Sequence, residues 1–201
     1  GQYRTSGFNM EGTHFYYLSD AGREFMALVE YEIESGTSNT IYESDWDVMY
    51  SLLSEQETFR VIAVNEDGKN KLLIFDNATN TEIPFPEISD GDIKSVLFSD
   101  SEKLMRLMVG SSRTPENMYL YEFGESDYKK LTETLNPEIN PDDLVSSEVI
   151  RYTSFDGLEI PAIYYKPKTA SPDNPVPALV WVHGVPGDNH VWDFHLLFNI
   201  L

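Results

Sequence analysis

The sequence contains no cysteine, few basic residues and no long hydrophobic run. Without thiols, disulfides, thiolate nucleophiles and cysteine-ligated zinc sites are excluded, although the cellular compartment stays open. The 14 Lys and Arg residues against 34 Asp and Glu give a net charge of −20, which argues against binding to nucleic acid phosphates. No apolar stretch approaches the roughly 18 residues that indicate a membrane-spanning helix.

The composition is that of a globular protein. Of the 201 residues, 41% are hydrophobic and 13% are aromatic, which is enough to build a sizeable core. The acidity indicates a solvated surface or, alternatively, the steering of cationic substrates into a cleft. The alternating residues Glu30, Glu32 and Glu34 are expected on the solvated face of one strand.

The first 145 residues alternate short apolar strands with turns rich in Gly, Asn, Asp and Ser, and a repeat runs through them. The matching pairs, at offsets of 45 or 46 residues, are Ser51–Glu55 with Val96–Asp100, Phe59–Asn65 with Met105–Ser111, and Leu73–Asp76 with Tyr119–Glu122; a looser copy runs from His14 to Tyr42. This period predicts β-propeller blades, two of them complete and one partial. A stack of β-hairpins without radial closure is the alternative.

The pattern changes after a linker at 136–145, which contains two prolines and several acidic residues. We therefore expect one domain over 1–145 and a second over 146–201. Residues 148–153 and 159–165 predict two strands joined by a turn at Phe155-Asp156-Gly157. Because Pro161 has no amide donor, this hairpin is expected at a sheet edge.

An apolar run, Pro177 to Val182, predicts a fully buried strand that ends in His183-Gly184-Val185-Pro186-Gly187. Asp188 or Asn189 is then expected to cap an amphipathic helix. Leu201 follows with no C-terminal cap, so we expect the chain to be a fragment. A short glycine-rich turn after such a strand is typical of the oxyanion hole of α/β-hydrolases.

These residues resemble the prolyl oligopeptidase family of serine peptidases. The similarity rests on Tyr152–Pro161, on Tyr165–Pro167 and on Leu179–Gly187, and Trp192-Asp193 is similar to the acylaminoacyl-peptidase branch. Bacterial dipeptidyl peptidases are the other similar branch. The resemblance implies a mostly β chain: about three propeller blades, followed by the first strands and helix start of an α/β-hydrolase domain. It also implies short peptides as substrates, no cofactor and no metal.

By the same resemblance, the backbone N–H of Val185 is one oxyanion donor, Gly184 allows the tight turn, and His183 and Pro186 are structural. The family has glycine where Val185 stands, and a β-branched residue tolerates positive φ poorly. No G-x-S-x-G motif is present, since Gly124 to Tyr128 lacks the closing glycine, so the catalytic triad is expected beyond Leu201. A non-catalytic propeller binding protein with a hydrolase remnant, or an esterase, are the alternatives.

Overall fold

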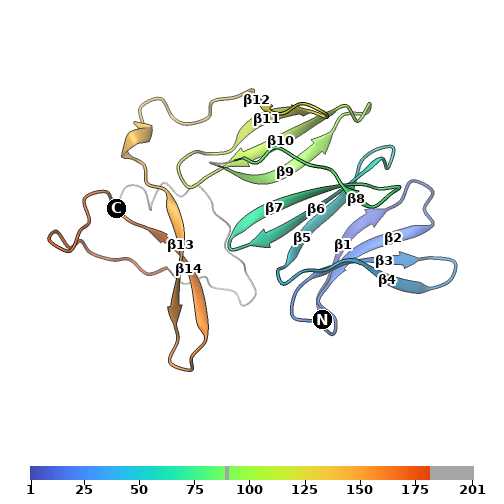
Figure 1. The fold of residues 1–201 in the computed structure, drawn as a ribbon, viewed down its shortest axis with the longest axis horizontal. Helices are drawn as coiled ribbons and strands as arrows, with labels where there is room; N and C mark the ends of the chain where they lie inside the picture. Colours follow the sequence, from blue (N-terminus) through green and yellow to red (C-terminus); the bar gives the residue numbers. More distant parts are fainter. Residues whose placement is uncertain (89–90, 182–201) are drawn as a thin grey trace.

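The computed structural model describes residues 1–88 and 91–181 and consists almost entirely of antiparallel sheets. Three of the sheets have four strands each, and every strand pairs with the next one along the chain (Figure 1). The first sheet contains β1 (Tyr3–Phe8), β2 (His14–Ser19), β3 (Ala27–Glu32) and β4 (Thr37–Tyr42). The second contains β5 (Val48–Leu53), β6 (Phe59–Glu66), β7 (Lys69–Asp76) and β8 (Thr81–Glu82). The third contains β9 (Asp92–Phe98), β10 (Leu104–Gly110), β11 (Asn117–Glu122) and β12 (Tyr128–Lys130).

The predicted repeat is confirmed, with two corrections. The first concerns the earliest copy, which is a complete four-stranded sheet and not a partial one, because β1 adds a fourth strand that pairs with β2. The sequence did not reveal β1 because Tyr3–Phe8 is largely polar, and its pairing with β2 is interrupted by a bulge between Thr5 and Gly7.

The second correction is a one-residue change in the register of the repeat. The amides of His14, Phe59 and Leu104 donate in the same way to the side chains of Asn9, Ser54 and Ser99, at 2.8, 2.9 and 3.2 Å. β6 is therefore equivalent to β10 at an offset of 45 residues, not 46. A one-residue shift matters because it moves every side chain to the opposite face of the sheet.

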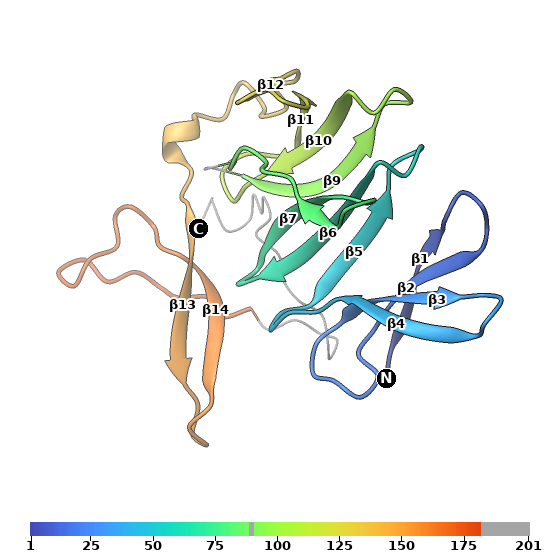
Figure 2. The ribbon, with the colours of Figure 1, turned by 45° about the vertical axis from the view of Figure 1, so that its right-hand side comes forward.

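The three four-stranded sheets lie side by side (Figure 2), and the hydrophobic core lies between them. Alternate residues of β6 face opposite sides of the second sheet. Val61 packs against the third sheet, whereas Ile62 and Val64 pack against the first. The second sheet is thus buried on both faces, as a blade between two others. A blade buries its surface only against its neighbours, so the stability of this region depends on sheet-to-sheet packing.

A further repeated contact joins the turns that follow β1, β5 and β9. Glu57 and Glu102 occupy equivalent turn positions with φ of 57° and 56°, a region where glycine is usual. Each carboxylate reaches the turn of the preceding sheet: Glu102 accepts from the Gln56 amide at 2.6 Å, and Glu57 accepts from the Met10 amide. The first sheet has Gly12 (φ 69°) at this position. At both glutamates, the positive φ therefore coincides with a hydrogen bond from the carboxylate to the neighbouring blade.

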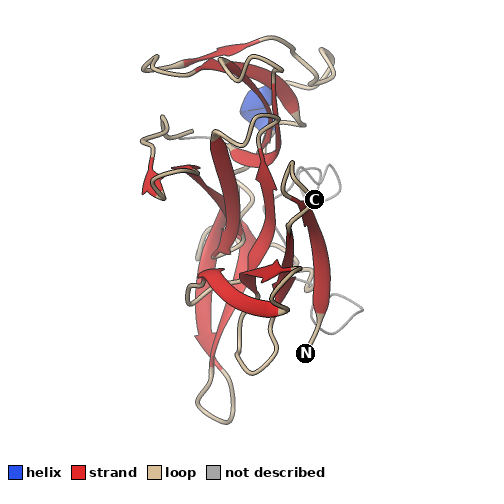
Figure 3. Cartoon of the chain, turned by 90° about the vertical axis from the view of Figure 1, so that its right-hand side faces the viewer, coloured by secondary structure: helices blue, strands red, loops and turns tan. Residues whose placement is uncertain are grey.

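After β12 the chain passes through the short 3₁₀ turn η1 (Pro141–Asp143) into a two-stranded sheet of β13 (Ser147–Thr153) and β14 (Glu159–Tyr165). Figure 3 shows strands and loops throughout, apart from this turn. In the part of the chain that the structure describes, no helix is long and apolar enough to cross a membrane.

Candidate functional site

The hairpin β13–β14 confirms the strands and the turn predicted for 148–165. Gly157 has φ of 90°, and the turn closes with hydrogen bonds from the Ser154 amide to Leu158 O and from the Gly157 amide to Ser154 O. The Leu158 amide donates to the Asp156 carboxylate and, with Ser154, holds the pKa of Asp156 below its ordinary value. Pro161 lies opposite Arg151 in a sheet that has only two strands within the described residues, so both strands are edges there, as predicted.

Two loops of the second and third sheets hold this hairpin and the segment before it. We call them the docking loops: the β6–β7 turn at Asp67–Gly68 and the β10–β11 loop at 111–116. The Ser147 amide donates to Ser112 Oγ at 2.9 Å in a buried contact, and Asp67 forms an ion pair with Arg151. Arg113 Nη2 donates to Pro141 O at 2.9 Å. The hairpin is thus attached by polar contacts at one end of the blades.

The predicted buried strand at 177–182 is not observed in its described part. Residues 175–181 form no strand, and Leu179, Val180 and Trp181 are 59%, 82% and 65% exposed. A strand needs a neighbouring strand for its backbone hydrogen bonds, and the described residues place none beside this segment. Its apolar side chains therefore remain uncovered, and the prediction of burial is wrong for 177–181.

The predicted oxyanion residues His183, Gly184, Val185 and Pro186 lie outside the described residues. So does the predicted helix after Asp188. In the segment Gly124 to Tyr128, which lacks the full serine motif, residues 124–127 form the exposed connection between antiparallel β11 and β12, and Tyr128 begins β12. A nucleophile elbow joins a strand to a helix, so this location agrees with a turn of a blade.

A buried polar cluster lies at the docking end of the second and third sheets. Asp92 accepts from the Asn70 amide at 2.7 Å and pairs with Lys94 at 2.9 Å. Burial raises the pKa of Asp92, and Lys94 only partly opposes this effect. Burial also raises the pKa of Tyr50, with a further increase from Asp92, so the Tyr50 hydroxyl stays protonated. Among the described residues, that hydroxyl is buried and has no hydrogen-bond partner.

A pocket of about 350 Å³ opens between the first and second sheets, at the end of the second sheet opposite to Asp67. Its lining includes Arg60, Tyr16, Phe8 and Met10. Arg60 Cζ lies 4.3 Å from the centroid of the Tyr16 ring. No pattern in the sequence indicates this pocket, because its walls come from strands that are about 45 residues apart.

The acidic residues predicted on one strand face are only partly found there. Glu30 and Glu32 belong to β3 and are half-buried, whereas Glu34 lies beyond the strand end in an exposed turn. Glu30 stands opposite Tyr16 in the register and interacts with its hydroxyl. The three carboxylates therefore do not form one solvated row.

No protein-family model matches the sequence, and no curated protein matches it. The structure is similar to prolyl oligopeptidase B from Galerina marginata, solved with a 35-residue hydrolysis and macrocyclization substrate, with a TM-score of 0.69 and 16% identity over 85% of this chain. The chain has the fold of these peptidases. Dipeptidyl peptidase 4 from Porphyromonas gingivalis matches 83% of the chain with a TM-score of 0.62 and 16% identity.

A puromycin-hydrolyzing peptidase from Mycobacterium tuberculosis has the same peptidase fold. It matches 89% of the chain with a TM-score of 0.67 and 12% identity. The chain spans about a quarter of the length of each of these proteins: 25%, 24% and 27%. The three four-stranded sheets thus form part of a propeller of the prolyl oligopeptidase type.

Proposed function

We propose that this chain is part of a serine-type peptidase that hydrolyses short peptides through an acyl-enzyme. In this proposal residues 1–145 belong to the propeller and 146–201 begin the α/β-hydrolase domain. The observation that carries it is the likeness of the fold to peptidases over 85% of the chain, combined with His183-Gly184-Val185-Pro186-Gly187 after the β13–β14 hairpin. The order of blades, hairpin and glycine turn is the order that this type of enzyme requires.

The chemistry assigned to the turn is stabilisation of an oxyanion. Attack on a peptide carbonyl builds negative charge on its oxygen, and a positioned backbone N–H lowers the energy of that state. The Val185 N–H is the proposed donor, with Gly184 permitting the turn and with His183 and Pro186 fixing its shape. The serine, aspartate and histidine of the triad would come from other parts of the whole protein.

The blades are proposed to control access to this site. Two features support this role. The apolar cores between the sheets make the blades rigid, and the docking loops attach the blades to the hairpin that precedes His183 in the sequence. Rigid blades beside the site would admit short peptides more easily than folded proteins. No cofactor is required for this chemistry.

The test replaces the proposed donor in the full-length protein. Val185→Pro removes the N–H and is expected to lower kcat on a short peptide by roughly 10² to 10³-fold. Val185→Ala keeps the N–H and is the matched control, expected to stay within a few-fold of the parent. Equal kcat values for the two variants would refute the role of Val185, and absence of peptide hydrolysis in the parent would refute the peptidase itself.

A second function, a propeller that only binds, is favoured by one observation: Val185 stands where the family has glycine. An inactive parent protein that still binds peptides would support it. An esterase is distinguished by hydrolysis of p-nitrophenyl esters without hydrolysis of peptide amides.

A further inference from the structure

Arg60 interrupts the repeat. The hydrogen bonds that define the register place Phe15, Arg60 and Met105 at the same position of the three sheets, each directly after the strand-opening residue. Two of the three are apolar, as expected for a position that faces a neighbouring blade. In the second sheet this position carries a positive charge, which needs an explanation.

The charge of Arg60 is buried without an anionic partner. The residue is only 6% exposed, and its Nε donates to the neutral Asn77 Oδ1 at 3.2 Å. Among the described residues, no carboxylate lies within ion-pair distance of it, although the chain has 34 acidic residues. Buried charges are usually paired, because an uncompensated ion loses its hydration without replacement.

Its neighbours do not supply the missing negative charge. Burial raises the pKa of Tyr16, and the opposing effect of Arg60 does not offset it, so the phenol stays neutral. The attraction between the guanidinium and the ring is that of a cation and a neutral π-system. Glu30 interacts with the Tyr16 hydroxyl and forms no ion pair with Arg60. Among the described residues, no carboxylate therefore pairs with Arg60, and Arg60 lines the pocket.

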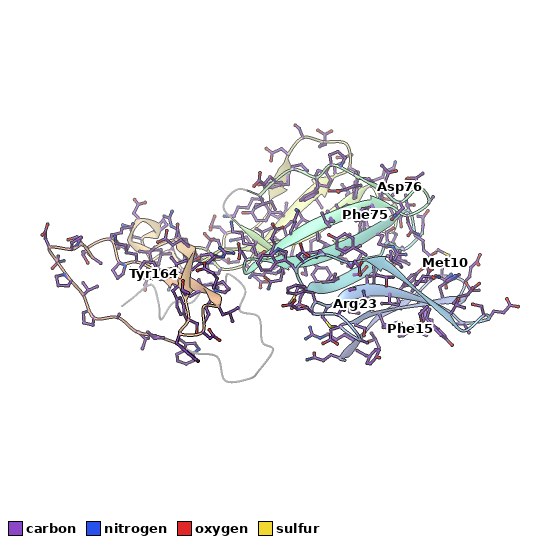
Figure 4. The ribbon with its side chains drawn as sticks, turned by 60° about the horizontal axis from the view of Figure 1, so that its bottom comes forward. Met10, Phe15, Arg23, Phe75, Asp76 and Tyr164 are labelled. Carbon is purple, nitrogen blue, oxygen red and sulfur yellow. The ribbon has the colours of Figure 1, made fainter. Side chains whose placement is uncertain are left out.

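The pocket is open to solvent and is large enough to hold a small molecule. Its volume of about 350 Å³ lies at the lower end of the range for ligand pockets. Phe8, Met10 and Leu52 give it an apolar wall, and the buried Arg60 provides its cation. Glu55 and Glu57 also line it, and the Glu57 carboxylate accepts from the Met10 amide. Met10 lies at the end of the molecule away from Tyr164 of the hairpin (Figure 4).

We propose that this pocket binds a small monocarboxylate that carries an apolar group, such as the C-terminal residue of a short peptide. The planar guanidinium of Arg60 would take the carboxylate through two parallel hydrogen bonds, and the apolar group would lie against Phe8 and Met10. The nearby Glu55 and the net charge of −20 disfavour multiply charged anions such as phosphates. The site is separate from the docking end of the blades and from the proposed oxyanion turn.

The test is calorimetric titration of the full-length protein with N-acetyl-L-leucine, and it needs no catalysis. Saturable binding is expected, whereas N-acetyl-L-leucinamide, which lacks the carboxylate, should bind at least ten-fold more weakly. Acetate should also bind more weakly, because it lacks the apolar group. Equal binding of acid and amide would overturn the role of the carboxylate, and equal binding of acetate would overturn the role of the apolar wall.

Arg60→Met is the decisive variant, because the third sheet already has Met105 at this position. It should lose at least ten-fold in affinity, while Arg106→Met, an arginine replaced on β10, should bind as the parent does. Met10→Glu is a second variant, for use if Arg60→Met unfolds. The Met10 side chain is 66% exposed, and the substitution adds a negative charge at the pocket that should weaken binding of the carboxylate. Unchanged affinity in both Arg60→Met and Met10→Glu would refute the site.

Discussion

The blades and the β13–β14 hairpin are both built from antiparallel strands, yet they are stabilised differently. The second sheet contributes fully buried residues to cores on both of its faces, including Val61, Ile62 and Ile74. The hairpin exposes Ile150, Tyr152 and Tyr164 by 39%, 52% and 39%, and its polar contacts with the blades include one buried hydrogen bond and one ion pair. Alternating apolar residues thus form a strand in both regions, but only a facing sheet provides a core.

The largest difference is expected from matched truncations in the two regions. Leu107→Ala, at a fully buried position between the second and third sheets, should lower the free energy of unfolding by about 2–5 kcal/mol, because it leaves a cavity. Ile150→Ala in the hairpin should cost less than about 1 kcal/mol, because its side chain already contacts water. Chemical denaturation measures both. A similar loss for the two variants would contradict the comparison.

Ser112→Ala removes a buried hydrogen bond between the two regions. It leaves the Ser147 amide unpaired in a buried place, with an expected cost of about 1–3 kcal/mol. The loss should be local: amide hydrogen exchange should accelerate in β13 and β14 while β6 stays protected. Ser146→Ala, at an exposed neighbour, is the control and should change neither region. Faster exchange throughout the blades would show that the hairpin supports their cores.

Glu102 makes the contact between neighbouring blades dependent on pH. Burial alone would raise its pKa, but hydrogen bonds from Ser54, Thr58 and Gln56 together outweigh burial and hold the pKa below 4.5. A lowered pKa in the folded state stabilises the protein above the unfolded value, and this contribution is lost as pH falls through the folded pKa. Glu102→Gln should therefore destabilise the blades by about 1 kcal/mol at pH 7 and flatten the decline of stability in acid.

Denaturation midpoints between pH 7 and about pH 3 measure this dependence. Glu125→Gln, at an exposed position in the β11–β12 connection, is the matched control and should follow the parent curve. A Glu102→Gln curve parallel to that of the parent would show that the carboxylate contributes nothing to the contact.

The smallest effect is expected from Arg151→Ala. The ion pair between Arg151 and Asp67 lies at the surface, where solvent and salt weaken such interactions. The unfolding midpoint should stay within experimental error, at low salt as well as high salt. A clear loss of stability would mean that this ion pair, and not the Ser112 contact, is the main attachment of the hairpin.

The sequence predicted what depends on local pattern. Alternating residues identified most of the strands, the 45-residue period identified the blades, and Phe155-Asp156-Gly157 identified the hairpin turn. The register of β6 against β10 was off by one because β6–β7 closes through two residues, whereas β10–β11 has a longer loop. One offset therefore cannot align both strands of the repeat, and the equivalence of Phe15, Arg60 and Met105 appears only with the hydrogen bonds.

What the sequence did not predict depends on contacts between distant segments. The apolar run at 177–182 has the composition of a buried strand, but burial also requires a partner strand, which no local pattern supplies. The pocket at Arg60 is formed by strands of two different blades, so its lining cannot be read from one segment. The predicted 46-residue offset also aligns Arg60 with Arg106, so the charged residue at an otherwise apolar repeat position is visible only in the structure.

The most direct test of the peptidase assignment is labelling of the purified full-length protein with a serine-directed phosphonate, followed by peptide mapping. We expect a single adduct on a serine outside residues 1–181, formed in parallel with the loss of hydrolysis of a short peptide. A protein that is neither labelled nor able to hydrolyse peptides or esters would contradict the assignment and leave the blades as a binding module.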